Sequence, residues 1–93
     1  MLVASLVLTF HIPWANSLKD KRMVVKSLCA KIKEKFGVSA AEVGEQDIHR
    51  TAVIGVACVG TATSQLDSVL DHIIAWAERH GDAELADVQR EFR

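Results

Sequence analysis

The sequence predicts a single α/β domain of the α+β kind, with one four-stranded antiparallel sheet and two helices on one of its faces. Three observations lead to this fold class. A strict alternation of hydrophobic residues opens the chain, two later segments repeat hydrophobic residues at helical spacing, and 93 residues can bury one modest core but cannot split into two. Residues 1–93 are therefore expected to form one domain.

The first strand is expected to run from the N-terminus to the residue before Pro13. Its hydrophobic residues recur with a period of two, which is typical of a strand with one deeply buried face. The inward set is Leu2, Ala4, Leu6, Leu8, Phe10 and Ile12. The outward set, Val3, Ser5, Val7 and Thr9, lacks the aromatic residues that an RNA-recognition-motif sheet uses to stack bases.

The first helix is expected to begin after Ser17 and to end at Gly37. Ser17 and Asp20 have the spacing of a capping box, with aspartate in place of the usual glutamate. Hydrophobic residues then recur at helical spacing, as expected of the buried side of a helix: Leu18, Val25, Leu28, Cys29, Ile32 and Phe36.

The remaining elements follow the same logic. "VSAAEV" predicts a short second strand, "EQDIHR" a turn, and "TAVIGVACVG" a third strand that is too apolar for a sheet edge. Ser64 and Asp67 repeat the capping pattern at the start of a second amphipathic helix, which is expected to end at His80 and Gly81. Residues 84–92 alternate charged and apolar residues, as expected of a partly exposed last strand.

The resulting order is βαββαβ. Right-handed crossovers and short connections leave one common arrangement for it, the ferredoxin-like sandwich, in which both helices cover the same sheet face. In this topology the start of the first helix, the turn at 45–50 and the end of the second helix lie at the same edge of the molecule. Residues of these three segments are therefore expected to be neighbours.

Charge is distributed unevenly, although the net charge is only −1. Residues 17–36 carry seven basic and two acidic residues, so this segment is +5 and the remainder of the chain is −6. Lys19, Lys21 and Arg22 fall in the first turns of the helix, where the helix dipole repels each cation by about 0.3–1 kcal/mol. A polyanionic partner would explain why the sequence tolerates them.

The candidate site is therefore an anion-binding or RNA-binding surface on the first helix. Backbone N–H groups at a helix start, a serine hydroxyl and nearby cations together favour phosphate. The predicted residues are Ser17, Lys19, Lys21, Arg22, Lys26, Lys33 and Arg50. Two alternatives remain open: a solvated charged face balanced by acids of the second helix, and a pocket for a small anion.

One expectation separates these interpretations. Replacing Lys19, Lys21 and Arg22 with glutamine should weaken RNA binding and leave stability unchanged or slightly higher. A loss of stability would instead indicate that these side chains are held by the acids of the turn, Glu45 and Asp47.

Catalytic, metal and cofactor chemistry find no support in the sequence. Ser17 and Cys58 have no evident base and orienting acid, and "GTATS" lacks the lysine and spacing of a P-loop. The four histidines lack the spacing of metal ligands.

Cys29 and Cys58 are expected to be reduced thiols. The apolar N-terminal segment is too short to span a bilayer and lacks the basic start of a signal peptide. We therefore expect a cytoplasmic, non-enzymatic protein with no cofactor, no metal and no membrane partner.

The runs "HIPWANSLKDKR", "FGVSAAEV", "GEQD" and "AVIGVA" resemble the YlxP-like family of small uncharacterised bacterial proteins, DUF503. The family motif falls on His11, Ile12, Pro13, Ser17, Leu18, Lys19, Lys21 and Arg22. The resemblance implies a ferredoxin-like fold. It also implies an RNA-linked setting, because genes of this family often lie beside those for transcription and translation factors, and it assigns no catalytic role to any residue.

The functional expectation is a binding module that contacts RNA or a ribosome-associated complex through its cationic first helix. The alternative is a homo-oligomeric scaffold or small-ligand regulatory domain that binds no nucleic acid. Valines on the uncovered sheet face leave apolar area that could be buried in a homodimer, formed through the sheets or through an edge strand.

Overall fold

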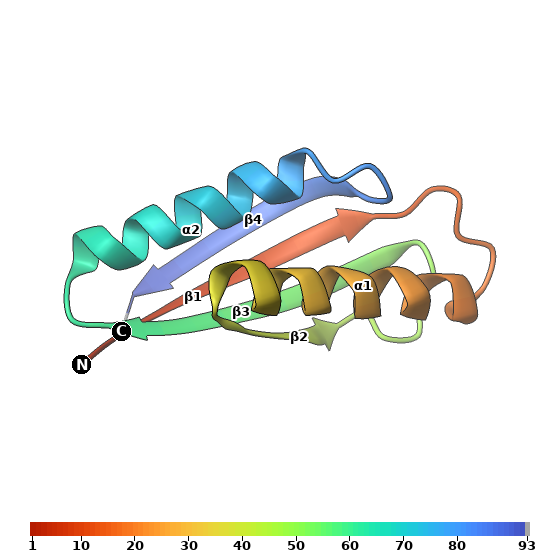
Figure 1. Cartoon of the computed structure of the whole chain (residues 1–93). Helices are drawn as coiled ribbons and strands as arrows, with labels where there is room; N and C mark the ends of the chain where they lie inside the picture. The colour runs from red at the N-terminus through yellow and green to blue at the C-terminus, as the bar shows by residue number, and fades with distance from the viewer. Residues whose placement is uncertain (93) are drawn as a thin grey trace.

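The computed structural model describes residues 1–92 and has the predicted βαββαβ order, with both helices on one face of a four-stranded sheet (Figure 1). The ferredoxin-like α+β arrangement is therefore confirmed. The elements are β1 (Leu2–His11), α1 (Leu18–Phe36), β2 (Ser39–Gly44), β3 (Thr51–Gly60), α2 (Thr63–Glu78) and β4 (Glu84–Phe92).

The strands are arranged in the order β2-β3-β1-β4, and every neighbouring pair is antiparallel. The interior place of β3 agrees with its apolar sequence, and the charged β4 lies at an edge. Register shifts interrupt two of the ladders, between Glu42 and Gly44 on β2 and between Thr9 and Phe10 on β1.

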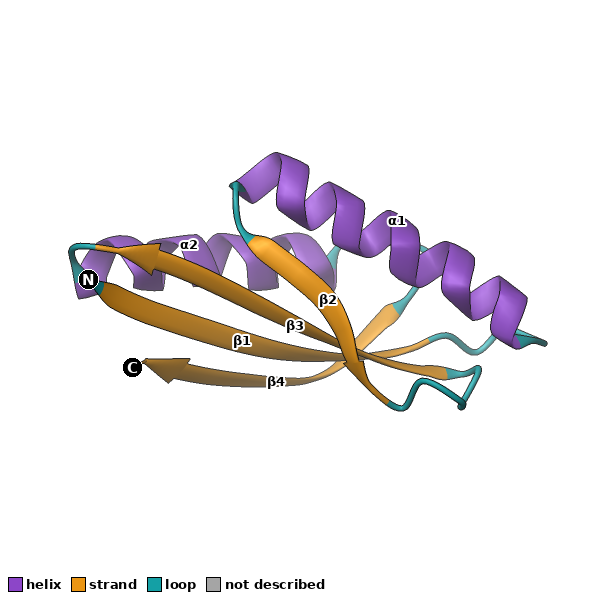
Figure 2. Ribbon diagram, turned by 90° about the horizontal axis from the view of Figure 1, so that it is seen from below, coloured by secondary structure: helices purple, strands orange, loops and turns teal. Residues whose placement is uncertain are grey.

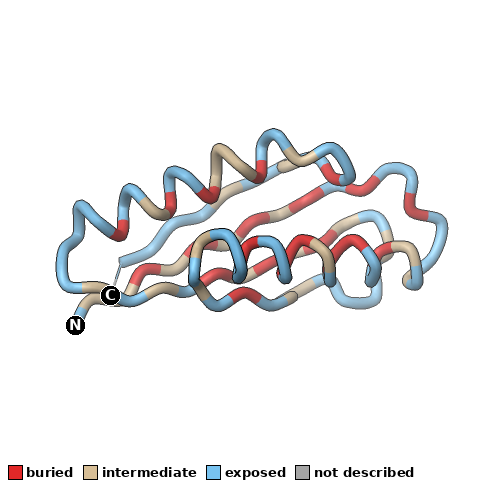
Figure 3. The backbone as a smooth tube through the Cα atoms, in the orientation of Figure 1, coloured by how far each residue is buried: buried red, intermediate tan, exposed pale blue. Residues whose placement is uncertain are grey.

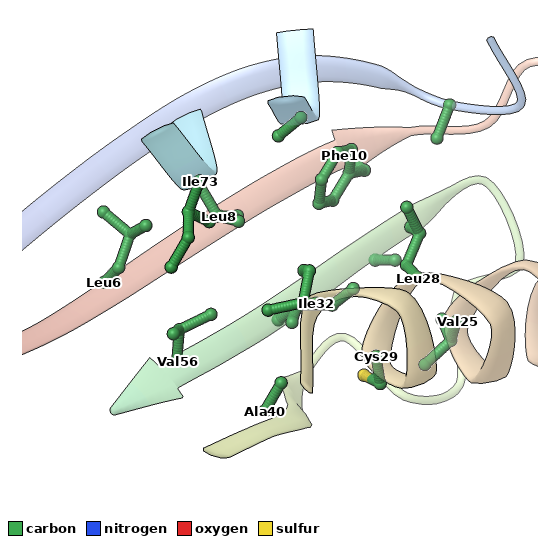
Figure 4. Close-up of a cluster of buried hydrophobic side chains, with 14 of the residues drawn as sticks. Leu6, Leu8, Phe10, Val25, Leu28, Cys29, Ile32, Ala40, Val56 and Ile73 are labelled. Carbon is green, nitrogen blue, oxygen red and sulfur yellow. The ribbon is translucent and has the colours of Figure 1, made fainter. Parts of the chain in front are cut away.

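The core lies between the sheet and the helices, as the buried segments in Figure 3 and the side chains in Figure 4 show. Leu6, Leu8 and Phe10 of β1 are fully buried, which confirms the predicted inward face. They meet Leu28 and Ile32 of α1 in the same cluster. Central β1 is buried because it pairs with strands on both sides while the helices cover one of its faces.

The predicted caps of α1 are confirmed. The Ser17 Oγ accepts a hydrogen bond from the Asp20 backbone N–H at 3.1 Å. The Asp20 carboxylate accepts in turn from the backbone N–H of Asn16 at 3.0 Å, one residue earlier than in the standard capping box. At the other end, Gly37 has a φ of 64° and donates its N–H to the Lys33 carbonyl at 3.0 Å. Glycine favours this left-handed cap because it lacks a Cβ.

The predicted cap of α2 is wrong. The helix begins at Thr63 and its N-cap is Ala62, which offers no side-chain hydrogen bond. Ser64 is already inside the first turn, so it cannot serve as the cap. Asp67 is instead paired with Arg90 of β4, a partner that local spacing could not indicate. The helix also ends at Glu78, slightly before the predicted end.

The two helices diverge across the sheet, as Figure 2 shows. Helix α1 packs on β2 and β3, whereas α2 packs on β1, β3 and β4. Their C-terminal parts approach each other where Phe36 contacts Trp76 edge to face, with ring centroids 6.2 Å apart. Trp76 packs against the core cluster but remains only partly buried.

Candidate functional site

Three connections meet at one edge of the molecule, as the topology predicts. The backbone N–H of Ile12 donates to the Arg50 carbonyl at 2.9 Å, and the Arg50 Nε donates to the Ala15 carbonyl at 3.2 Å. On the other side, the Trp14 indole N–H donates to the Asp82 carbonyl at 2.8 Å. The loop between β1 and α1 is therefore held between the β2–β3 turn and the loop that follows α2.

Lys21 does not belong to the exposed surface, which corrects the predicted site. Its side chain is 1% exposed, and its ammonium donates to the backbone carbonyls of Glu45 and of Ile48, the latter at 2.7 Å. The ammonium also lies 3.1 Å from the Glu42 Oε2 as an ion pair. Lys21 is therefore part of the structure beneath the turn and is not available to an external anion.

The position of Lys21 on α1 explains this burial. It lies on the same side of the helix as Val24, Val25 and Leu28, which are all buried. Its aliphatic stem lies along that apolar side while the charged end reaches the turn. Glu45 has a φ of 56°, which is uncommon for a residue other than glycine. Lys21 therefore holds this turn by binding the backbone carbonyls of the turn and the carboxylate of Glu42. The alternative interpretation had expected the side chains of Glu45 and Asp47 to hold it.

One of the free backbone N–H groups at the N-terminus of α1 has a partner within the chain. The Ser17 Oγ accepts from the backbone N–H of Asp20, and the Asp20 carboxylate places a negative charge in the first turn. An acid at this position interacts favourably with the helix dipole. Ser17 is therefore a capping residue, and Asp20 offsets the repulsion that the neighbouring cations experience.

Four of the predicted cations do form an exposed strip. Lys19, Arg22, Lys26 and Lys33 are exposed, and their spacing places them along one side of α1, which we call the basic flank. Within residues 1–92, none of the four side chains forms an ion pair or a hydrogen bond. Burial raises the pKa of the Cys29 thiol, and the positive charge of the nearby Lys33 partly offsets this rise.

Arg50 lies beside this helix start but has a partial structural role. Its Nε is bonded to the Ala15 carbonyl, whereas its terminal nitrogens form no hydrogen bond to any other described residue. Of the seven predicted site residues, the structure thus leaves the basic flank and the end of Arg50 accessible. It assigns Ser17 to a cap and Lys21 to the interior.

The opposite side of α1 carries cations that the sequence analysis left out of the site. Lys31 and Lys35 line hollows beside Trp76, and Arg79 at the end of α2 lines one of them. The i, i+4 spacing of Lys31 and Lys35 already indicated that they share a side of the helix. The accessibility of Trp76 beside them depends on how the two helices pack, which the sequence of α2 alone did not indicate.

The described residues 1–92 contain no group of three or more His, Cys, Asp or Glu side chains arranged to hold a metal ion. Both cysteines are free thiols, and burial raises the pKa of each. Neither helix in this part of the chain is long and apolar enough to cross a membrane.

Comparison with known proteins gives a family and one relative. A family model described as "Protein of unknown function (DUF503)" matches residues 3–90. The chain is also similar to the uncharacterized protein YlxP of Bacillus subtilis (strain 168), with 33% identity over 70 residues, which cover 75% of this chain and 76% of the relative.

Proposed function

The chain belongs to the DUF503 family of proteins of unknown function, and from this premise we propose that it is a non-enzymatic module that binds RNA or a ribonucleoprotein through the basic flank of α1. Lys19, Arg22, Lys26 and Lys33 would contact phosphates of the RNA backbone. Contacts of this kind supply most of the affinity of sequence-independent nucleic-acid binding.

The observation that carries this proposal is the lack of partners for the basic flank. Two other cations of the fold are paired: Lys21 with Glu42, and Arg90 of β4 with both Asp67 and Asp71 of α2, the latter at 2.6 Å. On α1, by contrast, four cations share one side, and no described acid neutralises any of them. Their mutual repulsion would be relieved by a polyanion, which releases counterions as it binds.

The acidic residues on the open sheet face also favour the basic flank as the RNA-binding surface. The register places Asp87 opposite Thr9 and Glu91 opposite Ser5, on the face that the helices leave open. The acids therefore lie along the β4 side of that face, and small or aliphatic residues fill the rest: Val3, Val7, Val53, Gly55, Ala57 and Val59. Such a face would repel phosphates, and β1 and β3 offer it no Phe, Tyr or Trp ring for stacking.

The test compares two single arginine variants and one combined variant. Binding to a structured RNA hairpin is measured over a range of salt concentrations. Arg22→Gln should lower the slope of log affinity against log salt by roughly 0.7–0.9, as expected for one lost phosphate contact. Arg90→Gln is the matched control, because Arg90 is already paired, and it should leave the slope unchanged.

The combined variant replaces all four residues of the basic flank with glutamine. Its affinity should fall at least about tenfold near physiological salt, because several phosphate contacts are lost together. RNA binding equal to that of the wild type would refute the proposed surface.

A second candidate, a homodimer through the open sheet face, is favoured by a specific feature. Val7, Val43 and Ala57 line a shallow, mostly apolar hollow of about 480 Å³ on this face. Apolar area of this kind is often an interface in a small domain. Sedimentation of the wild-type protein at high concentration distinguishes a homodimer from a monomer and is independent of the RNA measurement.

A further inference from the structure

A groove lies between the C-terminal parts of the two helices, on the side of the molecule opposite the open sheet face. It consists of two adjoining hollows of about 450 and 390 Å³ that share Lys35 and Trp76. Volumes of this size are in the range of small-ligand sites. We call this feature the helix groove and define it by Lys31, Lys35, Phe36, His72, Trp76 and Arg79.

Trp76 gives the helix groove a flat aromatic surface. Its indole meets Phe36 at an interplanar angle of 77° and His80 at 56°, with a centroid distance of 5.1 Å to the latter. Neither ring lies parallel to the indole, so neither forms a stacked pair with it. The neighbours hold the orientation of Trp76 and leave it partly exposed.

The rim of the helix groove is positively charged. Lys31 and Lys35 come from α1 and Arg79 from the end of α2, against a single lining acid, Glu34. None of the three cations forms an ion pair with any residue of 1–92. The helix groove thus combines an aromatic surface with unpaired cations from both of the helices that border it.

His72 adds a polar group with a defined orientation. Its Nδ1 lies 2.8 Å from the Ser68 carbonyl, which can only accept, so Nδ1 carries a proton. In the neutral ring, Nε2 is then an acceptor and has no partner among the described residues. An exocyclic amino group or an imino N–H of a base is a suitable donor for it.

We propose that the helix groove binds single-stranded RNA, with an unpaired base stacked on Trp76 and the flanking phosphates held by Lys31, Lys35 and Arg79. This inference rests on the proposed function and specifies the class of RNA. Stacking on an aromatic side chain beside a cationic track is how proteins hold unpaired nucleotides, whereas a duplex keeps its bases inside. An acidic peptide would satisfy the cations but would leave the indole without a planar partner.

The first test uses Trp76 itself as the reporter. In a Trp14→Phe background Trp76 is the only tryptophan, because the chain contains two. Its fluorescence is titrated with an oligouridine dodecamer, with an RNA duplex of the same length and with polyglutamate. We expect quenching by the single strand and little change with the duplex. Quenching by polyglutamate alone would overturn the proposal in favour of an acidic peptide.

The second test uses affinity. Lys35→Gln combined with Arg79→Gln should weaken binding of the oligouridine and leave the affinity for the duplex unchanged. Trp76→Leu should weaken oligouridine binding roughly 5- to 150-fold, the usual range for one stacked base. Trp14→Phe is its matched control and should bind like the wild type. A thermal melt checks that Trp76→Leu is folded, and the fluorescence test does not depend on that variant.

The outcomes separate this inference from the proposed function. If the basic-flank variant loses RNA affinity while Trp76 fluorescence and the groove variants do not respond, the helix groove is refuted and the proposed function stands. If the groove variants lose oligouridine affinity and the basic-flank variant does not, the groove is supported and the proposed surface is wrong. If the wild-type protein binds neither RNA, both proposals fail.

Discussion

Replacing Lys21 with methionine should strongly destabilise the fold, although Lys21 lies among exposed lysines on a surface helix. Methionine keeps most of the apolar stem in place but removes the ammonium. The change leaves the Ile48 carbonyl without its lysine donor and the Glu42 carboxylate, whose side chain is 20% exposed, without its cation. The effect is therefore that of breaking a buried ion pair from one side.

The expected loss is about 3 kcal/mol in the free energy of unfolding. Removing one partner of a buried pair costs about 3–5 kcal/mol, and the partial exposure of Glu42 favours the lower end of this range. A domain of this size loses roughly 4–8 °C in thermal midpoint for each kcal/mol. The midpoint should therefore fall by roughly 12–24 °C, measured by thermal melting and supported by urea titration.

Two further variants control this prediction. Lys19→Met, two residues earlier and exposed, should change stability by less than about 0.5 kcal/mol. Adding Glu42→Leu to Lys21→Met should recover part of the loss, because it removes the carboxylate left without a partner. Equal stability of the Lys21→Met and Lys19→Met variants would refute the structural role assigned to Lys21.

Four other predictions test the core, the sheet and the thiols. Leu8→Ala should lower the free energy of unfolding by about 2–5 kcal/mol in urea titration, because Leu8 is fully buried, and an unchanged midpoint would contradict the assigned faces of β1. Gly55→Ala would bring a Cβ to 2.9 Å from the Val43 Cγ1 and should destabilise by about 1 kcal/mol, a loss that disappears when Val43 is also alanine. Val7→Glu should convert a homodimer to monomer in sedimentation, and a wild-type protein that is already monomeric at high concentration would rule the homodimer out. Burial raises the pKa of the Cys29 thiol above its ordinary value of 9.0, so as the pH rises the unfolded state loses this proton before the folded state does. The free energy of unfolding, measured by urea titration, should therefore fall as the pH rises past 9.0, and it should fall less in the Cys29→Ala variant.

Most of the fold could be predicted from the sequence because its signals are local. The alternation in β1 and the helical spacing in α1 each follow from the geometry of one element, and the structure confirms both. The capping signal was reliable where the chain had one plausible cap, at Ser17. At Ser64 it failed, because Ala62 begins the helix without a side-chain cap and Asp67 has a stronger partner in Arg90.

The candidate site was predictable only in part. Lys19, Arg22, Lys26 and Lys33 were named from the sequence as site residues, and the structure leaves all four exposed along one side of α1. Lys21 was assigned to the same site, although the structure buries it on the inward side of α1, because an inward lysine is interpretable only when its partners are known. Those partners lie 24 and 27 residues away, at Glu45 and Ile48.

The sequence by itself determined the order of the elements, the buried face of each and the excess of positive charge on the first helix, because periodicity and composition act within a single element. Only the tertiary structure decided which cations remain unpaired and what lies beside them. Packing α1 against the β2–β3 turn buries Lys21, and the approach of the two C-terminal helix ends brings Trp76, Lys35 and Arg79 to one hollow. A charge or a ring acquires its role from its neighbours in space, and these come from segments far apart in the chain.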